Sequence, residues 1–469
     1  MSHGKDPREV FNSMSGADLL VNSGVYQLVV PDSATKLDAR GLPAFIPPDR
    51  ELEQSEYEEL LSVSAFSRVG PSEDELAMEL YGSQHEVKVD PVAGYYLATY
   101  VGHVVDDQDR ASSSSGGLTT WILQELLKSQ RVDGVIHLRT GGSGGLFSYG
   151  ISRTSAEISA GAKTRYYPAS LSNALTEILQ SAGRYAIVGI PSVLYEVRLA
   201  CHRDPSLKAR LPYFVGLVCG HQKSAHYAQS LAWQCGVAPG RIENIDFRVK
   251  LDAQPASAYG TEVQGVGQSG EQIRTVVETS RLYGTDWGLG YFKANFSDFS
   301  DDVFNETADV VLGDAWLPEY VQDPRGHNVV IVRSQEIAEL FQLGVQRGSI
   351  SVHAVPVADV LKSQAGLVRH GRTAIHDRTK YLAGRGEWVP ELRPGVPRST
   401  QSLGRRVIQQ LRVELARESH SAFNKAVASG DFEVFVRSMA PVRRKYQAAY
   451  RAASFVARVK RGLSSLNGK

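Results

Sequence analysis

Cysteine is scarce in this chain of 469 residues, which contains only Cys201, Cys219 and Cys235. They form neither a CxxC pair nor a disulfide framework, a pattern typical of a reducing compartment and unsuited to a cysteine-built zinc site. A 4Fe–4S cluster normally takes four thiolates. Because three scattered cysteines cannot supply that set, we expect no iron–sulfur cluster ligated by this chain alone, and no other metal site.

Long apolar runs and a net charge are lacking as well. No segment offers about eighteen uninterrupted apolar residues, and the charged N-terminal residues do not form a secretory signal, so we expect a cytoplasmic protein. The formal net charge is zero, with 51 basic and 51 acidic residues. This balance argues against a nucleic-acid binder.

The charge is nevertheless unevenly distributed. Residues 441–469 contain no Asp or Glu, and their basic residues are Arg443, Arg444, Lys445, Arg451, Arg458, Lys460, Arg461 and Lys469. Apolar residues recur between them at helical spacing: Val442, Tyr446, Ala449, Tyr450, Ala453 and Val456. Two interpretations remain open. The segment is either a helix docked on the core with a solvated basic face, or an attachment to an acidic partner or to the anionic inner face of a membrane.

The order of apolar segments predicts an α/β fold of mixed α+β type, with a central mixed or parallel sheet and flanking helices. Short apolar strands at 185–190 and 214–218 alternate with helices at 118–129, 171–183 and 193–201. Residues 240–265 and 273–295 are predicted to be antiparallel and β-rich. The predicted organisation is a degenerate N-terminal region without a strong core pattern (1–90), a core (91–365), a Gly-, Arg- and Pro-rich linker (366–400) and a helical basic extension (401–469).

A serine- and glycine-rich loop lies between a predicted strand and a predicted helix. Hydroxyls and glycine amides at a helix N-terminus can cradle a phosphate, because the unpaired N–H groups and the helix dipole favour an anion there. The candidate cofactor-binding residues are Ser113, Ser114, Ser115, Gly116, Gly117 and Thr120. An ordinary N-cap would give the same pattern, so the spacing alone leaves both interpretations open.

A second candidate segment follows the apolar strand that ends near residue 218. Gly220, His221 and Lys223 lie where an α/β sheet presents ligand-binding groups, beyond the carboxyl end of a strand. His221 and Lys223 are the candidate catalytic residues, because each can donate a hydrogen bond to an electron-accepting ring or a phosphate. A structural histidine is the alternative.

A third candidate lies at the end of the apolar run 308–316, which delivers Asp314 and Trp316. Arg248 and Lys250 share one face of a neighbouring predicted strand and are candidates for a cationic wall beside a cofactor. The simpler explanation is that Asp314 lies in a turn, that Trp316 belongs to the core, and that Arg248 and Lys250 are solvated charges on a strand.

These segments, taken in order, resemble the beta-subunit family of coenzyme F420 hydrogenases and dehydrogenases over about residues 93–350. The segments that carry the resemblance are SSSGGLTT (113–120), VDGVI (132–136), GIPS (189–192), GLVCGH (216–221), DFRVK (246–250) and ADVVLGDAW (308–316). The resemblance implies FAD, a deazaflavin or another two-electron carrier, and 4Fe–4S clusters. The cluster cysteines of the family are replaced here by Ser192, Ser297 and Ser300, and serine is a poor ligand for such a cluster.

The resemblance therefore implies a flavin-dependent oxidoreductase that transfers a hydride without iron–sulfur clusters. FAD is the expected cofactor, F420 or NAD(P)H the expected electron donor, and a small molecule the redox substrate; a homo-oligomer would also be compatible. The alternative is a binding, scaffold or modifying protein of bacterial surface-polysaccharide biosynthesis that has lost the redox chemistry of the family.

Overall fold

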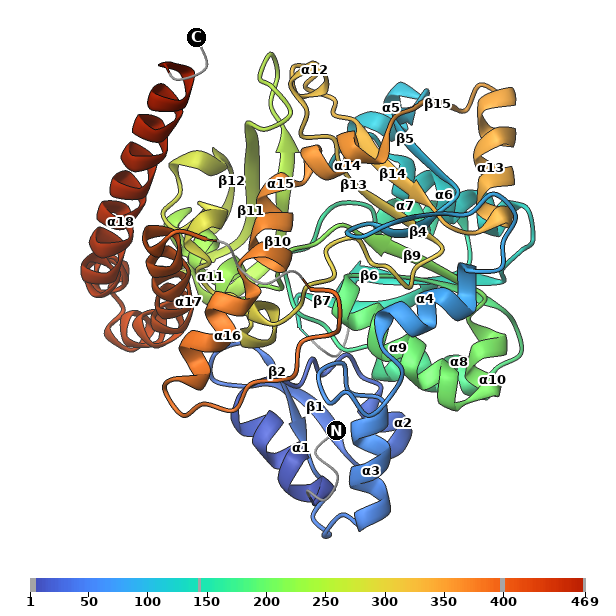
Figure 1. Cartoon of the computed structure of the whole chain (residues 1–469), viewed down its shortest axis with the longest axis horizontal. Coiled ribbons are helices and arrows are strands. Elements are labelled where there is room, and N and C mark those ends of the chain that lie inside the picture. Colours follow the sequence, from blue (N-terminus) through green and yellow to red (C-terminus); the bar gives the residue numbers. More distant parts are fainter. Residues whose placement is uncertain (1–5, 142–144, 397–400, 467–469) are drawn as a thin grey trace.

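The computed structural model describes residues 6–141, 145–396 and 401–466. Its centre is an eight-stranded sheet in the order β15-β5-β14-β13-β9-β8-β6-β7, in which the pairs β6–β8, β8–β9 and β9–β13 are parallel and the others antiparallel (Figure 1). The strands are β5 (Ala98–Val104), β6 (Gly134–Thr140), β7 (Phe147–Ser152), β8 (Tyr185–Gly189), β9 (Tyr213–Leu217), β13 (Val310–Asp314), β14 (Asn328–Val332) and β15 (Ile350–Ala354). The predicted fold class is confirmed.

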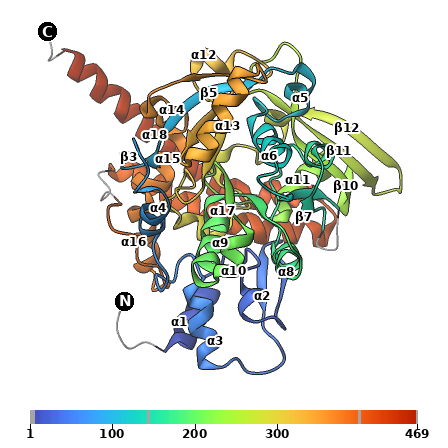
Figure 2. The same ribbon diagram turned by 90° about the vertical axis from the view of Figure 1, so that its right-hand side faces the viewer.

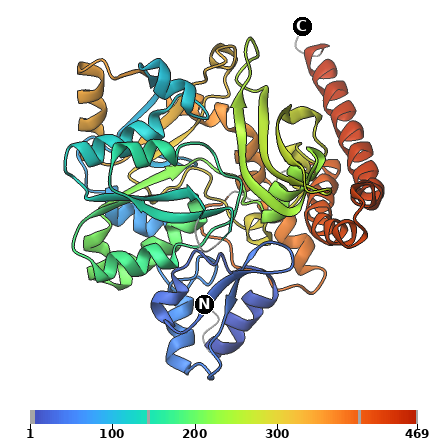
Figure 3. The ribbon, with the colours of Figure 1, turned by 180° about the vertical axis from the view of Figure 1, so that it is seen from behind.

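Both faces of this sheet are covered, because successive side chains of a strand point to opposite faces. Val310 and Leu312 of β13 pack with helices α6 (Leu118–Lys128) and α13 (Gln335–Gln346), whereas Val311 packs with α9 (Pro191–Arg203). The remaining helices at the sheet are α5 (Asp107–Ser112), α7 (Ser155–Ala160), α8 (Ser172–Gln180) and α10 (Pro205–Arg210), visible from behind in Figure 3. Continuous apolar strands such as β8 and β14 are required for this two-sided burial.

The N-terminal region has a core, although its sequence shows no strong core pattern. Phe11, Met14, Tyr26 and Leu60 are buried in a cluster that continues into α9. The elements are α1 (Pro7–Gly16), α2 (Tyr26–Val29), β1 (Ala34–Leu37), β2 (Pro43–Ile46), α3 (Gln54–Ser62), α4 (Glu73–Tyr81), β3 (Lys88–Asp90) and β4 (Gly94–Tyr96). Of these, α1, α2, α3, β1 and β2 form the lower part of Figure 1, and α4 and β4 lie higher, beside the large sheet. Because each is short, none shows the long hydrophobic period that reveals a core in sequence.

A second, three-stranded antiparallel sheet consists of β10 (Val237–Lys250), β11 (Tyr259–Gly267) and β12 (Gln272–Glu278). The predicted β structure is confirmed up to residue 278. Beyond it the prediction was wrong, because short 3₁₀ turns follow: η1 (Thr279–Arg281), η2 (Trp287–Leu289) and η3 (Asn295–Asp298). Gly284 and Gly290 adopt positive φ angles there, which break an extended strand.

The segment predicted as a linker, 366–400, is instead packed into the molecule as far as the structure describes it. It contains the end of α15 (Ala365–Val368), a π-helical turn η4 (Arg369–Thr373) and α16 (Ile375–Ala383), after α14 (Val357–Ser363). Its arginines Arg372, Arg378 and Arg393 are buried. We call residues 369–393 the arginine strap. The prediction failed because buried, paired arginines and solvated arginines look the same in a sequence.

The C-terminal extension is helical, as predicted. Helices α17 (Leu403–Ser429) and α18 (Phe432–Leu466) form a hairpin that turns at Gly430 and packs on α11 (Ala225–Gln234) through a second apolar cluster that includes Phe423 and Phe435. The distal part of α18 stands clear of the body in Figures 1 and 2. The short α12 (Pro318–Val321) completes the fold. Within the described residues, no helix is both long enough and apolar enough to cross a bilayer.

Candidate functional site

The ends of three strands bring several of the predicted residues together. Arg248 near the end of β10 donates to Asp314 at the end of β13, with Nη1 3.1 Å from Oδ2 and Nη2 3.4 Å from Oδ1. The Arg248 side chain is almost fully buried, and its guanidinium lies 4.3 Å from the Tyr259 ring and 5.4 Å from the Trp316 ring. Asp314 is therefore an ion-pair partner that fixes a cation, and Trp316 lines the same site.

Lys250 links this pair to the serine loop. Its Nζ donates to the backbone carbonyls of Arg110 and of Ser115, the latter at 3.0 Å. Burial, reinforced by Lys163, Arg110 and Arg248, lowers the pKa of Lys250 to about 7. The three cations that add to the effect of burial mark a concentration of positive charge that a bound anion would relieve.

The hydroxyls of the serine loop are already engaged within the protein. Ser113 Oγ donates to the Asp109 carbonyl and Ser115 Oγ to the His327 carbonyl, while Ser114 Oγ accepts from the amide of Thr164. These bonds hold the loop in place. The Ser113 and Ser115 hydroxyl protons are used within the protein and that of Ser114 is not, so a phosphate there would be bound mainly through backbone amides.

The start of α6 leaves two such amides. The amide of Leu118 donates to Asn328 Oδ1 at 3.1 Å, and helix geometry leaves the amides of Thr119 and Thr120 without intrahelical acceptors. Gly117 caps the helix with φ +85°, a left-handed conformation that favours glycine. Gly116 has no room for a side chain, because an added Cβ would lie 2.7 Å from the carbonyl oxygen of Gly102.

Lys223 is buried beside aromatic rings rather than exposed. Its Nζ donates to the Tyr291 carbonyl at 2.6 Å and lies 4.7 Å from the Trp287 ring and 4.9 Å from the Tyr227 ring. Burial first, and then the charge of Lys293, lowers its pKa to about 7. At neutral pH, Lys223 is therefore close to the midpoint between its charged and neutral forms.

His221 lies against the same tryptophan, with ring centroids 4.7 Å apart. Burial and then Lys223 and Lys293 hold its pKa well below the usual value, so the imidazole is neutral. Its Nε2 is buried without a hydrogen-bond partner among the described residues. An unpartnered ring nitrogen of this kind is available to a ligand. Gly220, just before it, approaches α15 closely, since an added Cβ would lie 2.6 Å from Leu367 Cδ2.

A short antiparallel bridge positions Lys223 beside Lys293. The amide of Ser224 donates to the Phe292 carbonyl at 2.8 Å, and the amide of Ala294 donates to the Gln222 carbonyl at 2.9 Å. Phe292 adopts φ +58°, a strained conformation for a bulky residue. Lys293 in turn pairs with the buried Asp298. No sequence pattern pointed to Lys293, because its distance of 70 positions from Lys223 hides the bridge.

Partly exposed aromatic rings connect the two groups of cations. Trp287 contacts Tyr166 with ring centroids 4.8 Å apart, and Tyr166 lies within electrostatic range of Arg248. Trp287, Tyr166, Tyr259 and Trp316 form what we call the aromatic strip, which runs from Lys223 to Arg248. Of these rings only Trp316 was singled out from the sequence, since the others come from three separate loops and strands.

The positions next to the cysteine-replacing serines are held by arginines of the strap. Arg378 contacts Asp298, with Nε 3.0 Å from Oδ1, and Arg393 Nε lies 2.6 Å from Asp301 Oδ2. Ser297 Oγ is buried and accepts from the amide of Gln222 at 3.1 Å. Ion pairs and hydrogen bonds thus fasten the segment at which the resemblance places cluster ligands.

The residues present do not fit an iron–sulfur cluster. Burial raises the pKa of Cys201 to about 12 and that of Cys219 to about 11, whereas a cluster needs thiolates. In the part of the chain that the structure covers, no three metal-ligating side chains come together.

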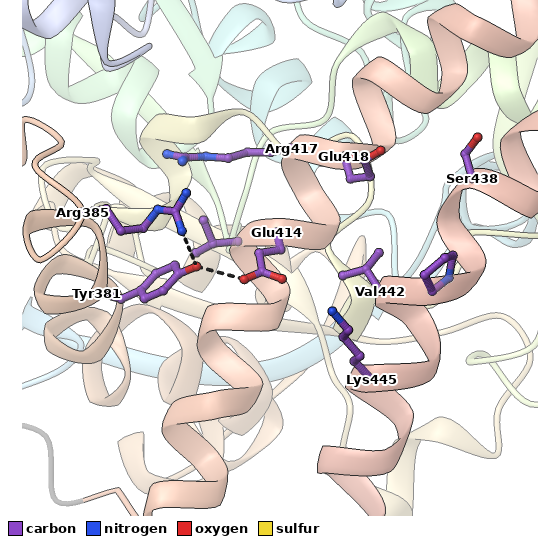
Figure 4. Close-up of a pocket in the computed structure, with 10 residues that line it drawn as sticks. Tyr381, Arg385, Glu414, Arg417, Glu418, Ser438, Val442 and Lys445 are labelled. Carbon is purple, nitrogen blue, oxygen red and sulfur yellow. Dashed lines mark hydrogen bonds between the residues drawn. The ribbon is translucent and has the colours of Figure 1, made fainter.

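A groove of about 490 Å³ lies between α16, α17 and α18, away from this site (Figure 4). Four of its side chains are engaged in contacts within the protein: Tyr381 donates to Glu414 at 2.9 Å and accepts from Arg385 at 3.4 Å, and Arg417 pairs with Glu387 at 2.8 Å. Because acidic and basic side chains both line it, this groove offers little net electrostatic preference for a ligand.

Comparison with protein families gives two matches. Residues 99–176 match the family described as the N-terminal part of the beta subunit of coenzyme F420 hydrogenase/dehydrogenase, and residues 182–357 match the family described as the C terminus of the same beta subunit. Together they span more than half of the chain and contain the serine loop, His221, Lys223, Arg248 and Asp314.

Among solved structures, a chain of the F420-reducing NiFe hydrogenase complex from Methanosarcina barkeri is similar to this chain. The similarity covers 65% of this chain and 98% of that chain, with 16% sequence identity and a TM-score of 0.48. Comparison with curated protein sequences finds no match.

Proposed function

Since the chain belongs to the coenzyme F420 hydrogenase/dehydrogenase beta-subunit family, as its six sequence segments predicted, we propose that it binds FAD and transfers electrons in pairs without an iron–sulfur cluster of its own. One observation carries this proposal. Lys223 lies at one end of the aromatic strip and Arg248 at the other, and Lys250, whose pKa is lowered to about 7 like that of Lys223, is within electrostatic range of Arg248. A flat ring system joined to an anionic diphosphate matches such an arrangement of aromatic surface and cations.

The phosphate end of the cofactor would be held by the cations around the serine loop. Lys250, Lys163 and Arg110 converge there, and Asp246 and Asp323 are the carboxylates paired with two of them. Positive charge is therefore only partly compensated, and the free amides at the start of α6 add two hydrogen-bond donors aimed at an anion. These features support binding of the diphosphate at this place.

The ring end would lie against the aromatic strip near Trp287. When bound, FAD supplies hydride chemistry that side chains cannot perform. The protein's own part is to orient the ring and to stabilise charge: protonated Lys223 Nζ offsets negative charge beside Trp287, and near neutral pH the same atom can take up or release a proton. The unpartnered Nε2 of neutral His221 can make one further hydrogen bond. Reduced F420 or NAD(P)H is the proposed hydride donor, and an organic small molecule the acceptor.

The test is the visible spectrum of the purified chain, followed by extraction and chromatographic identification of the chromophore. We expect the absorbance bands of a flavin, and the extracted chromophore should be FAD. Anaerobic titration with reduced F420 or with NADPH should bleach these bands. A colourless protein that takes up no FAD when it is supplied would refute the proposal and favour the non-redox binding role.

A matched pair of variants distinguishes a specific effect of Lys250 on FAD binding from the general effect of removing one positive charge. Lys250→Met removes a cation at the serine loop and should weaken FAD binding by roughly tenfold or more, in line with the worth of a charged hydrogen-bonding partner. Arg274→Met removes an exposed cation of β12, 72% accessible, and should leave binding unchanged. Equal losses in both variants would contradict the assignment of Lys250.

A further inference from the structure

The distal end of α18 carries an apolar stripe that is exposed to solvent. Ala448, Ala452, Phe455 and Val459 follow one another at intervals of four, three and four residues, and all four are exposed. Phe455 is 67% accessible. We call these four residues the outer stripe. At 3.6 residues per turn this spacing places them along one line of the helix.

The outer stripe is distinct from the face with which α18 packs onto the protein. That inner face consists of Val442, Tyr446, Ala449 and Ala453, which contact the apolar cluster of α11 and α17. Because an α-helix turns about 100° per residue, the two faces lie roughly a third of a turn apart. Folding of this chain therefore explains the inner face and leaves the outer stripe unexplained.

The geometry of the hairpin places the outer stripe at its free end. A Cβ added at Gly404, near the start of α17, would lie 3.4 Å from Ala453 Cβ, so α18 runs on past the start of its partner helix. Figures 1 and 2 both show this part of α18 standing clear of the body. Leu403, at the start of α17, is 78% accessible and adds apolar surface at the same end.

Positive charge borders the stripe and is not compensated by acidic residues nearby in the sequence. Arg444, Arg451 and Arg458 recur at every seventh position and are exposed. The chain contains no Asp or Glu between residues 392 and 413 or between residues 434 and 469, the two stretches that form this end of the hairpin. A second copy of the chain would bring like charges together at this surface, which disfavours self-association through it.

We propose that the free end of the α17–α18 hairpin binds an anionic lipid surface, with the outer stripe inserted among the acyl chains and the arginines at the headgroups. An apolar stripe flanked by arginines on a helical segment without acidic residues is the pattern of a helix that lies in a membrane interface. Attraction to an anionic surface contributes roughly a fivefold gain in affinity for each basic residue near it. This binding does not depend on whether FAD is bound.

The test uses the full chain and vesicles of phosphatidylglycerol or of phosphatidylcholine in a flotation assay. Binding is expected to the anionic vesicles only and to weaken as salt is raised, since salt screens exposed charges. Arg451→Gln with Arg458→Gln should weaken it on the order of 25-fold, and Phe455→Asp by about tenfold or more. In Phe455→Trp, lipids brominated in their acyl chains should quench the added fluorescence.

The controls carry the same chemical changes elsewhere. Arg274→Gln with Arg281→Gln removes two cations that are 72% and 77% accessible, and Met78→Asp changes an apolar residue that is 66% accessible; both should bind as the unmodified chain does. Equal binding to both vesicle types, or losses of the same size in controls and test variants, would overturn the proposal. The proposal would also be overturned if the chain did not bind vesicles but formed a dimer that the Phe455→Asp substitution dissociates.

Discussion

Replacing Arg393 by methionine should destabilise the whole fold, because Arg393 is the most heavily paired cation of the arginine strap. Its Nε lies 2.6 Å from Asp301 Oδ2 and its Nη2 2.5 Å from Glu306 Oε1, and all three side chains are 1–3% accessible. Removing one partner of a buried pair costs about 3–5 kcal/mol, since the remaining charge is left without compensation. Arg372 still lies 2.5 Å from Glu306, so we expect a loss near the lower limit, about 3 kcal/mol.

The loss is measured as the free energy of unfolding in urea for the variant and the unmodified chain. It should shrink when the pH is lowered from about 8 to about 5, because protonation neutralises a buried carboxylate that has lost its partner. Arg325→Met is the matched control: its pair with Asp107 has side chains 53% and 86% accessible, and such exposed pairs contribute less than about 1 kcal/mol. A loss below about 1 kcal/mol for Arg393→Met, or one independent of pH, would refute the account of the strap.

Three further predictions concern buried groups. Burial lowers the pKa of Lys223 to about 7, so between about pH 7 and 10 the folded state binds fewer protons than the unfolded state. The free energy of unfolding in urea should therefore rise with pH in that window, and Lys223→Met should flatten the rise. Burial raises the pKa of Glu196 to about 7, so its effect on stability has the opposite sign. Its contribution to the free energy of unfolding is complete below about pH 4.5 and is lost as the pH rises through 7, and Glu196→Gln should abolish this pH dependence. Gly116→Ala should cost about 1–3 kcal/mol by the same assay, because its Cβ would meet backbone at 2.7 Å; an unchanged free energy would contradict the close packing of the serine loop.

Much of the fold was predictable from local pattern. Strands such as Tyr185–Gly189 and Tyr213–Leu217 were recognisable because a strand buried on both faces must be apolar throughout. The position of Asp314 at the end of one strand and of Lys223 beyond the end of another also followed from sequence, since the carboxyl ends of parallel strands share one edge of a sheet. Local periodicity, however, does not show which charged residue is solvated and which is buried.

The amino-acid sequence by itself determined the alternation of strands and helices, the family, the cysteine count that rules out a cluster with four cysteine ligands from this chain, and the amphipathic end of the chain. Only the tertiary structure decided that Trp287 lies over Lys223, that a β-bridge joins Lys293 to Lys223, and that Arg393 reaches Asp301. These contacts join residues tens of positions apart. Their energies depend on burial, which exists only after the chain has folded and excluded water from the charges.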